Sequence, residues 1–156
     1  MIKQKKGDIL QSDAVCIVIP VNSVGVMGKG LAHQFKKAYP GVYERYKYAC
    51  RKNVITPGSI TFEQMGYRSG VKAYDANAIP QVAILAATKN HWRNPSELHW
   101  IIEILKNLGT AIDEGKIQSL AVPRIGCGHG GLRWAVVKPL VFATLGTKPI
   151  EVQIYE

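Results

Sequence analysis

The stretch AVCIVIPVNSVGVMGKG, residues 14–30, decides the fold. Its first part, Ala14 to Val21, is almost wholly apolar and rich in Val and Ile, which is typical of a strand buried on both faces of a parallel sheet. A helix is expected from Gly30 to Tyr39, because apolar residues recur on one side of it and Pro40 follows. Three glycines punctuate the loop between them: Gly25, Gly28 and Gly30. Glycine lets backbone N–H groups approach an anion closely, and a helix N-terminus adds a favourable dipole, so the loop predicts a diphosphate site.

A second glycine-rich loop, Gly126-Cys127-Gly128-His129-Gly130-Gly131, follows a predicted strand over Ser119 to Val122. Ligands of open parallel sheets bind beyond the carboxyl ends of strands, so the two loops could clamp one diphosphate from both sides. The second loop matches GxGxxG, the pattern of dinucleotide-binding folds. Only 25 residues follow Gly131, too few for the rest of such a domain, which argues against that fold. No GxxxxGK[ST] pattern is present, so a nucleotide hydrolase of the P-loop kind is not indicated either.

The remaining segments continue the alternation of strands and helices. Further strands are expected over Ser59 to Glu63, at an edge of the sheet, over Gln81 to Ala87 and over Ile150 to Tyr155. Further helices are expected over Val42 to Cys50 and over Trp134 to Leu145, the latter interrupted by Pro139, and residues 66–70 are expected to form a turn. This alternation predicts one domain, residues 1–156, with helices on both faces of a mainly parallel sheet.

The segment Asn94-Pro95-Ser96-Glu97 predicts the start of a long helix. Asn94 would cap it, Pro95 would be its first residue, and Glu97 stands three residues after the cap. An apolar stripe then recurs at spacings of three and four, which indicates a helix packed on the sheet. The stripe comprises Leu98, Ile101, Ile102, Leu105, Leu108 and Ile112, and Gly115 closes the segment.

The composition narrows the partners and the compartment. A formal net charge of +9 favours anionic partners such as phosphates and nucleic acid. The three cysteines show no CxxC spacing, so neither a disulfide framework nor a zinc site is indicated. No run of about 18 apolar residues and no signal peptide are present, and we therefore expect a cytoplasmic protein without a membrane partner.

Taken together, several segments resemble a macrodomain. They are Gly7-Asp8-Ile9-Leu10, Val21 to Gly30, Thr88-Lys89-Asn90-His91-Trp92-Arg93 and Pro123-Arg124-Ile125-Gly126-Cys127-Gly128. Within that superfamily the sequence looks most like the DNA ADP-ribosyl glycohydrolase antitoxins of the DarG type, relatives of the human terminal ADP-ribose glycohydrolase. The resemblance implies a three-layer α/β/α fold with a mixed, mainly parallel central sheet, ADP-ribose bound at the top of that sheet, and no cofactor.

The resemblance also implies which residues contact ADP-ribose. Asp8 would accept a hydrogen bond from the adenine amine, Ile9 would line the same pocket, and Tyr155 would flank the adenine. Asn22 would bind the distal ribose and share in catalysis. The other expected contacts are Val26, Met27, Gly28, Lys29, Gly30 and Leu31 in the first loop, Thr88 beside the catalytic lysine, and Gly126, Cys127, Gly128, His129, Gly130, Gly131 and Leu132 in the second loop.

Lys89 is the expected catalytic residue, since glycohydrolase activity in this branch depends on the lysine that it matches. Breaking an N-glycosidic bond develops negative charge on the departing base. Lys89 could act by electrostatics, as a proton donor, or, with a lowered pKa, as a nucleophile at the anomeric carbon. The human relative has an acidic residue at the position of Gly130, and its absence here favours a non-covalent or water-dependent role. His129 is either its replacement or a surface donor, and with Cys127 it forms only a CxH pair, short of a metal site.

Trp92 and Arg93, beside Lys89, offer a stacking surface and a cation, a combination common in single-stranded DNA binding; alternatively, Trp92 belongs to the core. The expected substrate is therefore ADP-ribosylated DNA, carrying the modification on thymidine in a single strand. A non-catalytic ADP-ribose reader, a hydrolase of protein-linked ADP-ribose and an ADP-ribose 1″-phosphate phosphatase remain alternatives. Antitoxins of this type bind a DNA ADP-ribosyltransferase toxin through a C-terminal region that this sequence lacks, so we expect either a fragment or a domain that acts alone.

Overall fold

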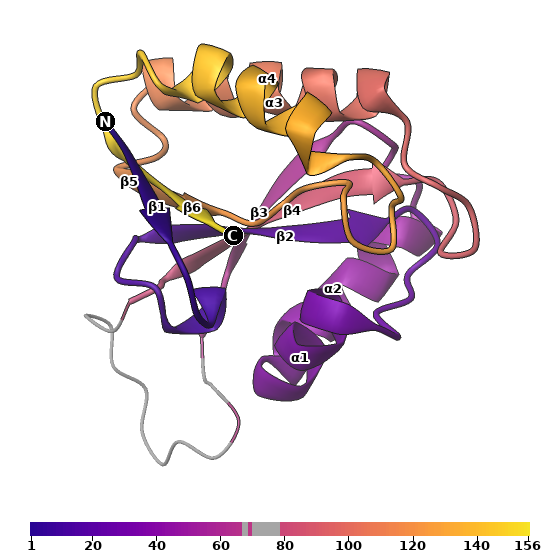
Figure 1. Ribbon diagram of the computed structural model, residues 1–156. Helices are drawn as coiled ribbons and strands as arrows, with labels where there is room; N and C mark the ends of the chain where they lie inside the picture. Colours follow the sequence, from indigo (N-terminus) through magenta and orange to yellow (C-terminus); the bar gives the residue numbers. More distant parts are fainter. Residues whose placement is uncertain (67–68, 70–78) are drawn as a thin grey trace.

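In the described residues, six strands form one sheet in the order β1-β6-β5-β2-β4-β3 (Figure 1). The computed structural model describes residues 1–66, 69 and 79–156. The strands are β1 (Ile2–Lys5), β2 (Cys16–Asn22), β3 (Ile60–Gln64), β4 (Val82–Lys89), β5 (Ser119–Val122) and β6 (Glu151–Tyr155). Only β3 runs antiparallel to its neighbour, and it lies at the sheet edge, as the sequence predicts. The sheet is therefore mixed and mainly parallel.

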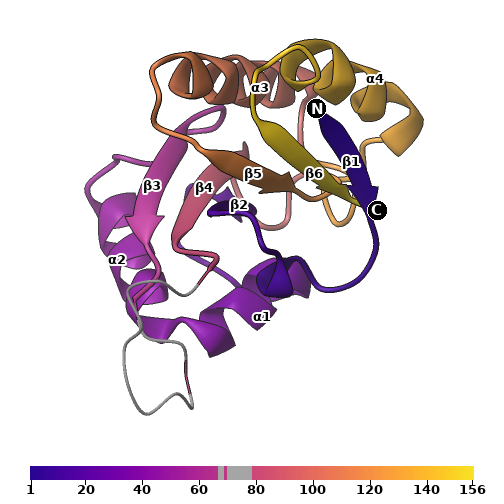
Figure 2. The ribbon, with the colours of Figure 1, turned by 90° about the vertical axis from the view of Figure 1, so that its left-hand side faces the viewer.

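Helices cover both faces of this sheet, α1 and α2 on one side and α3 and α4 on the other (Figures 1 and 2). They are α1 (Gly30–Ala38), α2 (Pro40–Arg51), α3 (Leu98–Asp113) and α4 (Trp134–Leu145), and a short 3-10 helix, η1 (Ile9–Gln11), follows β1. Pro139 lies inside α4 without ending it. This arrangement confirms the predicted three-layer α/β/α fold.

The central strand β2 contributes to both halves of the core. Successive side chains of a strand point to opposite faces of the sheet. Cys16 and Val18 accordingly pack in the apolar cluster under α3 and α4, whereas Ile17 and Ile19 pack in the cluster under α1 and α2. All four are at most 1% exposed, which explains why this segment of the sequence is apolar without alternation.

Parallel pairing brings the carboxyl ends of five strands to one edge of the sheet. β2 pairs in parallel with both β4 and β5, and β6 pairs in parallel with both β5 and β1. The register shifts between Val21 and Asn22, so that Asn22 at the end of β2 stands opposite Lys89 at the end of β4. The segments that follow these strands all start from this edge, and they include both glycine-rich loops.

Two sequence expectations are wrong in detail, and one strand was not predicted. The long helix begins at Leu98 with Glu97 as its N-cap, and not at Asn94; Glu97 has an extended backbone, and the Ser96 backbone N–H donates to the Gly130 carbonyl at 2.9 Å. Ile104 is fully buried on α3, whereas the predicted Ile102 is only partly buried. Strand β1 was not predicted, because its lysine-rich sequence suits a sheet edge more than a core. The predicted turn at residues 66–70 lies largely outside the described residues.

The burial of α3 predicts a difference between two isoleucines of the same helix. Ile104→Ala removes a fully buried side chain and is expected to lower the free energy of unfolding by about 2–5 kcal/mol. Ile102→Ala, in a partly exposed position, is expected to lower it by less than about 1.5 kcal/mol. Urea unfolding followed by circular dichroism measures both. Equal losses would contradict the placement of α3 on the sheet.

Candidate functional site

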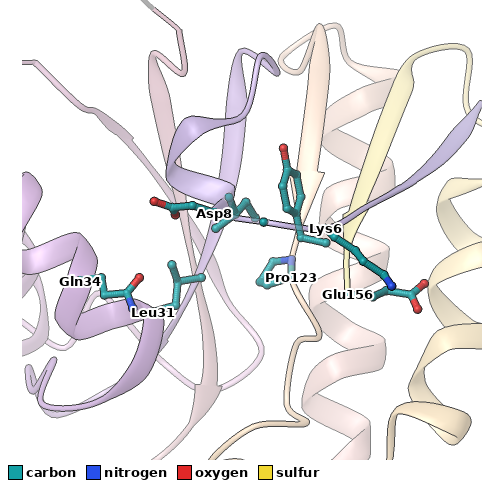
Figure 3. A pocket seen from close by; sticks show the side chains of 9 residues that line it. Lys6, Asp8, Leu31, Gln34, Pro123 and Glu156 are labelled. Carbon is teal, nitrogen blue, oxygen red and sulfur yellow. The ribbon is translucent and has the colours of Figure 1, made fainter.

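A cavity of about 620 Å³ lies at the carboxyl edge of the sheet (Figure 3). Its walls come from the segment after β1, from α1, and from the ends of β5 and β6. Leu31 and Gln34 of α1 lie on one side of it, and Lys6 and Glu156 lie on the other (Figure 3). The lining residues are Lys6, Gly7, Asp8, Ile9, Leu31, Gln34, Pro123, Tyr155 and Glu156.

The cavity gathers three residues expected around adenine, Asp8, Ile9 and Tyr155, together with Leu31, which was expected at the diphosphate and distal ribose. Asp8 also caps η1, since its Oδ1 accepts the Leu10 backbone N–H at 2.9 Å. The Tyr155 hydroxyl donates to Oε1 of Gln153 at 3.4 Å, and the Ser12 hydroxyl donates to the same atom at 2.8 Å. These bonds fix a carboxylate and a phenol at the wall of one cavity.

Asn22 shapes the first glycine-rich loop from within. Its Oδ1 accepts the backbone N–H groups of Val24 and Val26 at 3.1 and 3.3 Å, and its Nδ2 donates to the Val26 carbonyl at 2.8 Å. The Tyr46 hydroxyl lies 2.8 Å from both Oδ1 and the carbonyl oxygen of Asn22. Asn22 is only 6% exposed, so its amide organises the loop; its expected contact with a ribose stays a prediction.

The two glycine-rich loops meet where α1 begins. Gly30 has φ of +59°, a conformation that disfavours side chains, and a Cβ built on it would lie 3.5 Å from Cδ2 of His129. No side chain caps the first turn of α1, whose N-cap is Lys29. Unpaired N–H groups of a helix start favour anions. The arrangement therefore supports a diphosphate between the two loops, as the sequence predicts.

Gly130 leaves no space for a side chain. A Cβ at this position would collide with the Gly126 carbonyl oxygen and with Oγ of Ser96. Its own carbonyl accepts the Ser96 N–H at 2.9 Å, which fastens the loop to the segment before α3. The acid that the human relative carries here therefore does not fit this backbone. Gly128 differs, because nothing lies within 4 Å of a Cβ there.

Lys89 ends β4 beside the first loop. Its Nζ donates to the Trp92 carbonyl at 3.3 Å. Partial burial, together with the positive charge of Lys29, holds the pKa of Lys89 below its ordinary value. Thr88, the preceding residue, is buried. A lysine whose ammonium form is destabilised in this way donates a proton more readily, and it is also a better nucleophile when neutral.

Trp92 lies on the surface and not in the core. Its side chain is 41% exposed; the His91 ring stacks against it at 5.3 Å, and the Arg93 guanidinium lies 4.6 Å from its ring centroid. The loop that carries these residues is tied to the first glycine-rich loop, because the Ser23 hydroxyl donates to the Asn90 carbonyl at 2.6 Å. An exposed aromatic and cationic surface therefore adjoins Lys89.

The structure joins most of the expected residues in a single region, with two qualifications. The cavity of Figure 3 holds the proposed adenine end, but neither Lys89 nor the second loop lines it. Sequence reasoning missed five of its lining residues: Lys6, Gly7, Gln34, Pro123 and Glu156. Gly7, Gln34 and Glu156 directly precede, lie one helical turn from, or directly follow an expected residue. Lys6 lies two residues before Asp8 and Pro123 directly follows β5, so proximity in the chain was the available signal.

Residues 18–141 match the family model described as Macro domain. The chain belongs to the macrodomain family. The DNA ADP-ribosyl glycohydrolase of Thermus aquaticus is 36% identical over all of this chain and 41% of its own length. The structure of the Thermus aquaticus DarG macrodomain superposes with a TM-score of 0.88, covering 100% of this macrodomain and 98% of that chain. No helix in the described ranges is long and apolar enough to cross a membrane.

A second similar protein comes from Thermosipho africanus. A DNA ADP-ribosyl transferase-DNA ADP-ribosyl glycohydrolase fusion protein from this organism is 37% identical over 96% of this macrodomain and 40% of its own length. The structure of Thermosipho africanus DarTG in complex with ADP-ribose is 35% identical and matches with a TM-score of 0.87, over 99% of this macrodomain and 41% of that chain. This macrodomain thus spans less than half the length of these two relatives.

The crowding at Gly130 predicts opposite outcomes for two glycines of the second loop. Gly130→Ala forces the backbone to move and is expected to lower the free energy of unfolding by about 1–3 kcal/mol. Gly128→Ala enters open space and is expected to change it by less than about 0.5 kcal/mol. Chemical denaturation measures both variants. A neutral Gly130→Ala would show that the loop is looser than its contacts indicate.

The proximity of two ammonium groups predicts a shift at Lys89. Lys29→Gln removes the positive charge that disfavours the ammonium form, so the pKa of Lys89 is expected to rise. Nuclear magnetic resonance titration of ¹³C-methylated lysines measures the change. Lys106→Gln, an exposed position on α3, is the control and should leave the pKa of Lys89 unchanged. If the pKa of Lys89 is the same in Lys29→Gln as in the wild type, the charge of Lys29 does not act on Lys89.

Proposed function

We propose that the macrodomain binds ADP-ribose along the carboxyl edge of its sheet and hydrolyses the bond between ADP-ribose and a nucleobase. The nucleobase is that of thymidine in single-stranded DNA. The observation that carries the proposal is the position of Lys89. This lysine stands opposite Asn22 in the register of β2 and β4, its pKa is lowered, and it adjoins an exposed aromatic side chain. The DNA ADP-ribosyl glycohydrolases to which the chain is similar add support.

The geometry supports a ligand that spans the edge of the sheet. Adenine would enter the cavity beside Ile9, with its amine donating to the Asp8 carboxylate and its ring flanked by Tyr155. The diphosphate would lie against the first turn of α1, where Gly30 approaches His129 of the second loop. The distal ribose would then reach the end of β2, opposite Lys89.

The chemistry at this end is the hydrolysis of an N-glycosidic bond. Cleavage leaves positive charge on the ribose and negative charge on the departing base. Water supplies a hydroxyl group to the anomeric carbon, and the base accepts a proton. We propose that Lys89 provides that proton and takes up the proton released by water, or that it stabilises the base electrostatically; Gly130 leaves no space for the acidic residue that the human relative has at this position.

The surface around Lys89 supports a nucleobase as the leaving group. Trp92 is 41% exposed, and two apolar residues of the first loop, Val24 and Val26, are 46% and 37% exposed. Base stacking on Trp92 and phosphate contacts from Arg93 are sequence-tolerant ways of holding a single strand, and the two valines add apolar surface beside them. The fusion of a transferase with a glycohydrolase in Thermosipho africanus further supports a DNA ADP-ribosyltransferase toxin as a functional partner.

An assay with three substrates tests the proposal: an oligonucleotide carrying ADP-ribosylated thymidine, ADP-ribosylated protein and ADP-ribose 1″-phosphate. Wild-type protein is expected to release ADP-ribose from an oligonucleotide carrying ADP-ribosylated thymidine. Lys89→Ala should abolish release while ADP-ribose still binds, because the diphosphate and adenine contacts lie elsewhere. Lys89→Arg retains the charge and should keep part of the activity if the role is electrostatic. Chromatography of the released ADP-ribose and calorimetry of its binding provide the two measurements.

Lys106→Ala is the matched control, an exposed lysine on α3 away from the edge, and should retain full activity. Full activity in Lys89→Ala would refute the proposed chemistry. Tight binding of ADP-ribose without turnover of any substrate would make the protein a reader. Turnover confined to ADP-ribosylated protein or to ADP-ribose 1″-phosphate would refute the DNA substrate.

A further inference from the structure

The positive charge of the chain is concentrated in one segment. Residues 29–55 form the end of the first loop, α1, α2 and the turn after it, and they carry a net charge of +6 out of +9 for the whole chain. Glu44 is their only acid. The cations are Lys29, Lys36, Lys37, Arg45, Lys47, Arg51 and Lys52. The helical layer on one face of the sheet is therefore strongly basic.

These cations surround two tyrosines of α2. The ammonium groups of Lys36 and Lys47, one from each helix, lie 4.4 and 5.1 Å from the ring centroid of Tyr43. Arg51 and Lys52 lie 5.9 and 5.5 Å from the ring centroid of Tyr48. Tyr48 is 56% exposed. We call this surface the basic face; it comprises Lys36, Lys37, Tyr43, Lys47, Tyr48, Arg51 and Lys52.

Ion pairs occur in both helical layers, but the layer of α1 and α2 has a single acid of its own, Glu44. Beside α3 and α4, lysines pair with acids, as in Lys116–Glu114 at 3.0 Å and Lys148–Asp113 at 2.9 Å. In the layer of α1 and α2, the ion pairs between described residues are Lys47–Glu44 at 3.2 Å and Arg45–Glu63 at 2.8 Å, and Arg45 is therefore not counted in the basic face. A cationic surface with so few acids is attracted to a polyanion, since binding releases the counterions of that polyanion.

The basic face is continuous with the proposed catalytic site. A Cβ built on Gly25 of the first loop would lie 3.7 Å from Cα of Lys47 and from Cβ of Cys50. The Tyr43 hydroxyl donates to the Gly25 carbonyl at 3.4 Å. On its other side the same loop bonds to Asn90, two residues before Trp92, through Ser23. One loop thus separates the basic face from the exposed tryptophan beside Lys89.

We propose that the basic face binds the phosphodiester backbone of the single-stranded DNA that carries the modified base. The inference rests on the proposed function and assigns the path of the strand: from Trp92, across the first loop and onto α2. Alternating cations and exposed aromatic rings suit a single strand, because the cations contact phosphates and the rings stack with bases. Figure 2 shows α1 and α2 together on one side of the sheet, opposite α3 and α4.

Two triple variants with equal loss of charge test the proposal. The first, Lys37→Gln with Arg51→Gln and Lys52→Gln, alters the basic face. The control, Lys106→Gln with Lys116→Gln and Lys148→Gln, alters the opposite layer. Fluorescence anisotropy measures binding of an unmodified single-stranded oligothymidylate over a range of salt concentrations. The first variant should bind about tenfold more weakly or worse near 0.1 M salt, and its slope of log K against log salt should fall by about 2, at roughly 0.7 per phosphate contact.

The control should bind like the wild type, and both variants should hydrolyse ADP-ribosylated thymidine nucleoside at the wild-type rate. With the modified oligonucleotide, the first variant should raise KM and leave kcat unchanged. If both triple variants bind oligothymidylate equally well, the basic face is not the docking surface. The probe is unmodified DNA, so this test of binding does not depend on hydrolysis. If the proposed hydrolysis were wrong, no substrate would turn over, but DNA binding would still be weaker in the first variant than in the control.

Discussion

The parallel pairing of β2 with β4 on one side and with β5 on the other is the constraint on which the site depends. Because parallel strands end at the same edge, the loops that follow β2 and β5 emerge next to each other, and they meet at Gly30 and His129. The register shift at the end of β2 places Asn22 opposite Lys89. The proposed diphosphate site and a lysine with a lowered pKa therefore share one edge of the sheet.

The loops at this edge are held by specific polar contacts and by close packing. Asn22 provides three hydrogen bonds to the backbone of the first loop, and the Tyr46 hydroxyl meets the same amide from α2. Burial raises the pKa of Tyr46, so this phenol stays neutral at physiological pH. In the second loop, the crowding at Gly130 serves the same purpose. The backbone N–H groups that would face a diphosphate are thus oriented before the ligand arrives, which reduces the ordering that binding requires.

The sequence predicted the layers and both loops, because buried parallel strands have an unmistakable apolar pattern and glycine clusters interrupt it. It could not predict features that depend on contacts between distant segments. Asn94 is a typical helix-capping residue, yet Glu97 is extended, Ser96 bonds to Gly130 of the second loop, and the helix begins only at Leu98. Ile102 and Ile104 are the same residue type, and which of them is buried depends on the face that α3 turns to the sheet. The basic face could not be predicted from the sequence for the same reason, since Lys36 of α1 and Lys47 of α2 meet at Tyr43 only after the two helices pack together.

We thus propose one extended site, with adenine in the cavity at one end, Lys89 at the other and the basic face beyond it. The most direct test is a crystal structure of Lys89→Ala bound to an oligonucleotide that carries ADP-ribosylated thymidine. The account predicts adenine between Ile9 and Tyr155, the diphosphate against the first turn of α1, and the anomeric carbon within reach of the position of the missing ammonium group. A ligand whose anomeric carbon points away from the end of β4 would contradict it.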